Sequence, residues 1–213
     1  MLTDPNYLVP TTPPAATGVA WLRSSVARFS NGPTHARRRA LAVDSLAAIR
    51  PDDLRALAAH RGTGPVEVLA EALGLSPSIA DDIAIIAKSY QPHTEITQEA
   101  DEAVVRLVAL LGSNDEHTAN LIALLVQACD ATKALVANTL AGHTGPPVPK
   151  TRRIAPDGTT VEIDLTDTPF GAGSHACPAH LHALALADGL TAAGRQPGEL
   201  RRSDGASRAP AAP

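Results

Sequence analysis

One cysteine in the last quarter of the chain has neighbours that suit a metal-ligating thiolate. Cys177 follows a segment that contains Gly171 and Gly173, and it comes directly before the predicted start of a helix near Pro178. Glycines permit the tight backbone geometry of a loop. The free amides and the dipole at a helix N-terminus favour a thiolate over a thiol. The pattern therefore predicts a loop that directs a thiolate towards a metal ion such as iron.

The same segment permits two other interpretations. An H-x-C-x2-H-x-H pattern offers residue types that ligate zinc or copper, namely His175, Cys177, His180 and His182. His180 and His182 would lie about 200° apart around the predicted helix, which disfavours a shared metal ion. The other alternative is a glycine-rich turn around a buried cysteine that has no ligand role.

Two further groups of polar residues are candidates for a site. His35 and Arg39 lie four residues apart, so they share a helix face and can meet one carboxylate together. We interpret the adjacent Arg37 and Arg38 as solvated basic residues at a helix end.

Asp130 stands in a long apolar helical stretch, where a buried carboxylate is costly unless it is paired or functional. Two interpretations stay open for this residue. One is a contact with Lys133, three residues later on the same helix. The other is a catalytic role for Asp130, with Thr132 as the alcohol group that follows it.

The elements that position these residues are mainly helical, because alanine, leucine and valine supply most of the apolar residues. A Ser113–Glu116 capping box begins the longest helix, which is apolar nearly all round and therefore expected to be buried. The helices are expected over residues 15–30, 34–49, from Pro51, 65–73, 77–90, 97–111, 113–140 and 178–193. Short β segments at 151–154 and 159–164 flank an Asp157-Gly158 turn. We predict an irregular arm over residues 1–14, a domain over 15–193 and a disordered tail over 194–213.

The composition excludes several classes of protein. A chain of 213 residues that is 44% hydrophobic has enough material for one folded core. The net charge of −4 gives no basic field for nucleic acid. The N-terminus lacks the pattern of a signal peptide, and the apolar run 121–126 is too short to cross a membrane. Without secretion, two cysteines indicate a reducing cytoplasm rather than a disulfide.

The segment from Phe170 to Ala179 resembles the heme-binding loop of the cytochrome P-450 family, F-G-x-G-x-H-x-C-x-G. Every fixed position matches except the last, where Ala179 replaces glycine. The resemblance implies heme b as cofactor, with Cys177 as the axial ligand of its iron. It also implies that His175 contacts a heme propionate and that Phe170 packs near the thiolate.

Three other segments resemble the same family in the family's order. Residues 29–39 are similar to its C-helix, which assigns His35 and Arg39 to the propionates, and residues 147–153 are similar to a strand that assigns Arg153 to them. Residues 127–132 are similar to the oxygen-binding part of the I-helix. There Asp130 keeps the acid, but Ala131 replaces the alcohol, and Thr132 lies one residue further on.

The resemblance implies a shortened cytochrome P-450-like helical fold. Only residues 141–146 occupy the place of the K-helix with its E-x-x-R signature, and the N-terminal sheet region is absent. The one E-x-x-R string, 199–202, follows the cysteine and cannot replace it.

Two functions follow from the resemblance. The first is a heme-thiolate protein related to cytochrome P-450 monooxygenases, including one with non-monooxygenase heme chemistry. A monooxygenase would need an external ferredoxin or flavoprotein as electron donor, because the sequence carries no flavin, NAD or iron–sulfur motif. The alternative is a non-enzymatic remnant, an auxiliary protein whose exposed apolar faces bind a partner or form a homodimer.

Overall fold

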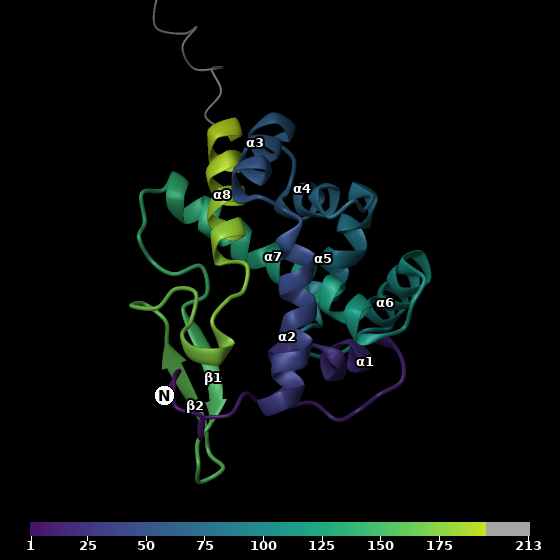
Figure 1. Cartoon of the computed structure of the whole chain (residues 1–213), viewed down its shortest axis with the longest axis vertical. Helices are drawn as coiled ribbons and strands as arrows, with labels where there is room; N and C mark the ends of the chain where they lie inside the picture. Colours follow the sequence, from purple (N-terminus) through teal and green to yellow (C-terminus); the bar gives the residue numbers. More distant parts are fainter. Residues whose placement is uncertain (195–213) are drawn as a thin grey trace, which may run out of the picture.

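The computed structural model describes residues 1–194, which form eight helices and one small sheet (Figure 1). This arrangement confirms the predicted mainly α fold with little β structure. The elements are α1 (Gly18–Ser25), α2 (Gly32–Ala47), α3 (Pro51–Arg61), α4 (Pro65–Ala72), α5 (Ala80–Lys88), α6 (Gln98–Leu111), α7 (Glu116–Leu140), β1 (Lys150–Ile154), β2 (Thr160–Asp164) and α8 (His180–Gly194). Of the predicted disordered tail, Gly194 is the last residue of α8, and residues 195–213 lie outside the described part of the chain.

Prolines and glycines set several helix ends, and the start at Pro51 agrees with the prediction from the sequence. Pro51 and Pro65 begin α3 and α4, where the missing N–H of proline is not needed for an intrahelical hydrogen bond. Gly62 and Gly112 follow α3 and α6 with φ angles of 60° and 81°. Glycine adopts this left-handed conformation without a steric penalty, so it ends both helices.

Asp115, and not a capping box, begins α7. Its carboxylate accepts the amide hydrogen of Thr118 at 2.8 Å and the hydroxyl hydrogen of Ser113 at 2.6 Å. The predicted Ser113–Glu116 box is wrong because Glu116 instead pairs with Arg38 of α2, at 2.8 Å. The expectation that Arg38 is solvated is also wrong, since its side chain is only 12% exposed.

Helix α7 passes through the middle of the fold behind α2 (Figure 1). It buries Ile122 and Leu125 in the main core, but it exposes Gln127, Asp130 and Lys133 along one stripe. The prediction of a helix buried all round is therefore wrong, because the neighbouring helices leave one side of α7 open. This also overturns the expected burial of Asp130.

Among the described helices, α7 is long and apolar enough to cross a bilayer by length and composition alone, contrary to the sequence-based expectation. Half of its most apolar window is buried inside the fold. The core helix of a soluble protein has the same properties, so this finding is weak evidence for a membrane segment.

Helices α3 and α8 pack with their backbones close together at Gly189. A Cβ added at Gly189 would lie 2.6 Å from the Cβ of Ala58 and 3.1 Å from the backbone nitrogen of Ala59. Only glycine leaves room for this approach. Helix α8 also packs against α7, so the helix that follows Cys177 is held from two sides.

The predicted hairpin is present, with β1 and β2 antiparallel around the Asp157-Gly158 turn. Leu8 of the N-terminal segment adds a bridge to the free edge of β1. Its two backbone hydrogen bonds with Ile154 measure 3.0 and 2.7 Å. Residues 1–14 contain no helix, and this bridge ties them to the hairpin.

Residues 141–149 lead from α7 directly to β1, and this fully described segment contains no helix. The finding agrees with the expectation that the K-helix region is absent. Within residues 1–194, the hairpin and the bridge at Leu8 are all the β structure, which agrees with the expected lack of an N-terminal sheet region. The fold is thus a set of helices around α7 with the cysteine loop between the hairpin and α8.

Candidate functional site

The loop before Cys177 has the tight geometry that its glycines predict. The amide of Cys177 donates to the carbonyl of Phe170 at 2.8 Å and closes the loop. Gly171 and Gly173 have φ angles of 73° and 70°, in the left-handed region. A Cβ at Gly173 would lie 2.9 Å from the carbonyl oxygen of Leu2, so the N-terminal segment covers this side of the loop. The backbone therefore fixes the position of Cys177 before any ligand binds.

Cys177 is a free, half-buried cysteine. Burial raises the pKa of its thiol, and this effect outweighs the backbone amide of Ala179 and the charges of Arg39 and Arg28, which lower the pKa. The expected preference for a thiolate is thus wrong for the ligand-free protein, because α8 begins only at His180 and burial dominates. A metal ion would reverse this balance, because a coordinating thiol loses its proton.

The four basic side chains predicted to bind propionates come together beside this loop. The ring centroids of His35 and His175 are 3.8 Å apart. Arg39, one turn after His35 on α2, donates to the carbonyl of Ala176 at 2.6 Å. Arg153 on β1 is only 5% exposed, and its charge acts on His175. Three segments far apart in the sequence therefore contribute to one group of basic side chains, in which Arg39 and Arg153 carry the positive charge.

No carboxylate forms an ion pair with this group within residues 1–194. Arg153 donates to the hydroxyl of Thr151 at 3.1 Å and to the carbonyl of Arg152 at 2.9 Å. Burial lowers the pKa of His35 and lowers that of His175 to about 4, and neighbouring cations add to both effects. The group presents positive charge that an anionic ligand would neutralise.

Arg28 is a fifth basic residue near the group, and the sequence motifs do not include it. It lies in the 3-10 turn Ala27–Phe29 just before α2, and its charge lowers the pKa of His175 and of Arg153. Its Nε is buried and has no hydrogen-bond partner among the described residues. Because Arg28 stands one residue before the segment that resembles the C-helix, no pattern in the sequence pointed to it.

The alternative zinc or copper site is wrong. The Nε2 of His182 lies 2.9 Å from the carbonyl oxygen of Ile49, away from the cysteine loop. His180 is exposed beside Phe170, with ring centroids 6.0 Å apart. In the part of the chain that the structure describes, no group of three His, Cys, Asp or Glu residues can hold a metal ion.

The two α7 residues predicted to act in catalysis lie on different faces of the helix. Asp130 is exposed, whereas Thr132 is buried with 3% of its surface accessible. Lys133 lies with its Nζ 3.5 Å from the Sγ of Cys129, and no ion pair joins it to Asp130 within residues 1–194. The expected Asp130–Lys133 contact is therefore wrong.

Leu124 places α7 relative to the cysteine loop. It packs with Ala42 and Leu46 of α2 and with Ala179, two residues after the cysteine. Asp130 lies six residues further along α7, about 9 Å at the rise of an α-helix. The structure thus brings Leu124 to the loop, and Asp130 and Thr132 lie one and a half to two turns beyond that contact.

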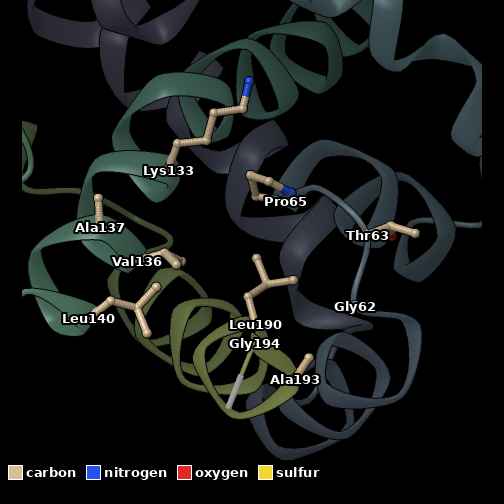
Figure 2. A pocket seen from close by; sticks show the side chains of 10 residues that line it. All are labelled: Gly62, Thr63, Pro65, Lys133, Val136, Ala137, Leu140, Leu190, Ala193 and Gly194. Carbon is tan, nitrogen blue, oxygen red and sulfur yellow. The ribbon is translucent and has the colours of Figure 1, made fainter. Parts of the chain in front are cut away.

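A groove of about 400 Å³ lies between the C-terminal parts of α7 and α8 and the turn from α3 to α4 (Figure 2). Its lining is mostly apolar and consists of Gly62, Thr63, Pro65, Lys133, Val136, Ala137, Leu140, Leu190, Ala193 and Gly194. Gly194 ends α8, whereas Cys177 lies just before its first residue. Because α8 has 15 residues and is about 22 Å long, the groove is separate from the cysteine loop.

Comparisons with known proteins bear on the fold. No protein-family model and no curated protein sequence matches the chain. Among solved structures, the chain is similar to the crystal structure of P450BioI in complex with hexadec-9Z-enoic acid ligated acyl carrier protein. The TM-score is 0.65 and the identity 14%, over 91% of this chain and 81% of that chain. The chain therefore has a cytochrome P-450-like helical fold.

Proposed function

We propose that the protein is a heme-thiolate protein related to cytochrome P-450 monooxygenases, with heme b as cofactor and Cys177 as the axial ligand. The observation that carries this proposal is the meeting of four basic side chains beside one half-buried cysteine, with no carboxylate paired to them within residues 1–194. The P-450-like fold supports it, since the same fold was expected from the motifs around these residues.

The residues present fit heme in charge and in donor type. Heme carries two propionate carboxylates, and its iron takes an axial protein ligand. Arg39 and Arg153 would bind the carboxylates through charge-assisted hydrogen bonds. His35 and His175 would become better donors beside the carboxylates, because an adjacent negative charge raises the pKa of a histidine. Cys177 supplies a sulfur beside this group of basic side chains.

A thiolate on heme iron favours cleavage of the O–O bond of a bound oxygen species. The contribution of the chain is to hold that thiolate in a fixed direction. Phe170 does so through its carbonyl, which accepts the amide hydrogen of Cys177, and its ring packs against His180. Gly171 permits the turn between them.

Asp130 and Thr132 are the residues of α7 that we propose for proton handling. The exposed Asp130 carboxylate can exchange protons with water, and the buried Thr132 hydroxyl can donate one hydrogen bond. Ala131 stands where related helices carry the alcohol, so the usual proton donor is missing. Isomerisation, dehydration or a peroxide-driven reaction therefore suits the site better than conventional oxygen activation.

If the protein is a monooxygenase, it needs an external electron donor, a ferredoxin or a flavoprotein. P450BioI was solved in complex with a carrier protein, which supports a protein partner for a fold of this kind. We place the protein in the cytoplasm, where its two free cysteines would stay reduced.

A non-enzymatic auxiliary protein is the second candidate. The observation in its favour is apolar surface on α8, where Leu181 and Leu184 are 56% and 40% exposed. Such side chains would be covered by a partner protein or by a second copy of the chain.

The absorption spectrum of the purified protein after hemin addition tests the proposal. We expect a Soret band at the position of ferric heme-thiolate in the wild type. Cys177→Ala should lose this band, whereas Cys129→Ala should keep it, since Cys129 lies in the helical core. Unchanged spectra of free hemin would contradict heme binding and leave the auxiliary protein as the better candidate.

A further inference from the structure

Arg28 has the features of a ligand-binding residue rather than a structural one. The Nε is buried without a partner in the described chain, although a buried donor that stays unpaired destabilises a fold. Its guanidinium carbon lies over the Phe29 ring, 5.8 Å from the ring centroid, and this contact uses none of its N–H donors in a hydrogen bond.

The backbone that carries Arg28 is fixed in place. The amide of Ala27 donates to the Oδ1 of Asn120 on α7 at 3.0 Å. The side-chain amide of Asn120 donates in turn to the carbonyl of Ser25 at 3.3 Å. On the other side of the turn, Asn31 and Val9 exchange two hydrogen bonds of 2.9 Å. The turn therefore does not need Arg28 to hold its shape.

The neighbours of Arg28 show which groups its side chain approaches. Its charge acts on Cys177, His175 and Arg153, all of which belong to the proposed heme site. It also acts on Tyr90, whose buried hydroxyl likewise lacks a partner among residues 1–194. Since both Arg28 Nε and Tyr90 Oη are unpaired, they do not bond to each other, and the donor is available for a ligand.

We propose that Arg28 is a fifth anchoring residue of the anion site, and that its Nε donates to a carboxylate of the ligand. This inference rests on the proposed function for the identity of the ligand, a heme propionate. The chemistry itself is wider, because phosphate and carboxylate groups are both bound by guanidinium donors. Arg28 would add its charge to those of Arg39 and Arg153, beside the imidazole donors of His35 and His175.

Binding of hemin and of hemin dimethyl ester tests this role, since the ester lacks free carboxylates. The chain has one tryptophan, Trp21, whose fluorescence quenching reports binding without any activity assay. We expect Arg28→Gln to weaken hemin binding about tenfold or more and to leave ester binding unchanged. The matched control is Arg50→Gln, because Arg50 is 78% exposed and pairs only with the equally exposed Asp53 within residues 1–194.

Equal losses of hemin and ester in Arg28→Gln would overturn the proposal, because they would show a structural role. No loss of hemin binding would overturn it as well. If the wild type binds neither compound, the proposed function fails, and inorganic phosphate then tests Arg28 separately. In that case we expect phosphate to raise the melting temperature of the wild type and of Arg50→Gln but not of Arg28→Gln. An equal response of all three proteins would contradict the role of Arg28.

Discussion

Two arginines five residues apart lie in regions with opposite properties. Arg23 in α1 is 7% exposed, and its guanidinium donates to the carbonyls of Tyr90, Ser89 and Thr94 at 3.2, 2.5 and 2.9 Å. Arg28 has a buried Nε without a partner in the described chain, and it lies near other cations. One region is complete without a ligand, and the other is not.

This difference distinguishes a buried charge that stabilises the fold from buried charges that we propose bind a ligand. The carbonyls around Arg23 replace the hydrogen bonds that water would make, so the residue joins α1 to the segment after α5. Around Cys177, in contrast, positive groups gather without negative ones, which costs stability unless a ligand brings the missing charge. The region around Arg23 is therefore part of the fold, whereas we propose that the region around Cys177 binds a ligand.

Replacement of each arginine by methionine gives the largest expected contrast. Arg23→Met should lower the free energy of unfolding by about 3 kcal/mol or more, because the buried carbonyls of Ser89 and Tyr90 and the partly buried carbonyl of Thr94 lose their donor. Arg28→Met should leave this free energy unchanged or raise it in the ligand-free protein, because no hydrogen bond is lost and an unpaired buried donor is removed. Urea denaturation measures both values. Equal destabilisation by the two variants would contradict the distinction.

The packing of α8, which holds the helix after Cys177, should be sensitive to a single methyl group. Gly189→Ala should lower the free energy of unfolding by about 1–3 kcal/mol, because the added Cβ meets Ala58 and Ala59. Gly194→Ala is the control, since a Cβ there meets nothing within 4 Å in the described chain. Thermal unfolding followed by circular dichroism compares them, and equal melting temperatures would refute the close packing.

Two substitutions at the start of α7 compare the predicted N-cap with the observed one. We expect smaller changes in the free energy of unfolding here. Asp115→Ala should cost about 1 kcal/mol, because the helix loses its N-cap acceptor. Ser113→Ala should cost less, since Ser113 only donates to that carboxylate. Chemical denaturation of both variants is the measurement. A larger loss of stability in Ser113→Ala than in Asp115→Ala would favour the predicted Ser113–Glu116 capping box.

The pH dependence of the ligand-free protein should show the smallest effect. Burial, and then the charge of Arg39, lowers the pKa of His35 below its ordinary value of 6.5. Below pH 6.5 the unfolded chain therefore binds more protons than the fold, and the free energy of unfolding falls as the pH falls. His35→Gln should flatten this slope between pH 7 and 5, whereas exposed His180→Gln should not. The free energy of unfolding is measured by urea titration at each pH. The same slope against pH in the wild type and in His35→Gln would contradict the effect of burial on His35.

The fold could be predicted where local chemistry decides it. Pro51 and Pro65 set helix starts, and Gly171 and Gly173 set the cysteine loop, because backbone geometry alone determines these positions. The surroundings of Asp130 could not be predicted in the same way. Its exposure depends on which side of α7 the other helices cover, and a single apolar helix does not reveal that.

The same limit applies to the candidate site. Four of the basic side chains, His35, Arg39, Arg153 and His175, could be predicted, since each belongs to a segment with a family pattern. Arg28 belongs to no pattern and joins the site only through tertiary packing. The preference of Cys177 for its thiol form also depends on burial, which the position before a helix does not reveal.

X-ray absorption at the iron edge of the hemin-loaded protein tests the central claim most directly, because it identifies the atoms bound to iron. We predict one sulfur ligand in the wild type and in Cys129→Ala, and none in Cys177→Ala. An iron site with only nitrogen and oxygen ligands in the wild type, or a sulfur ligand that persists in Cys177→Ala, would contradict it.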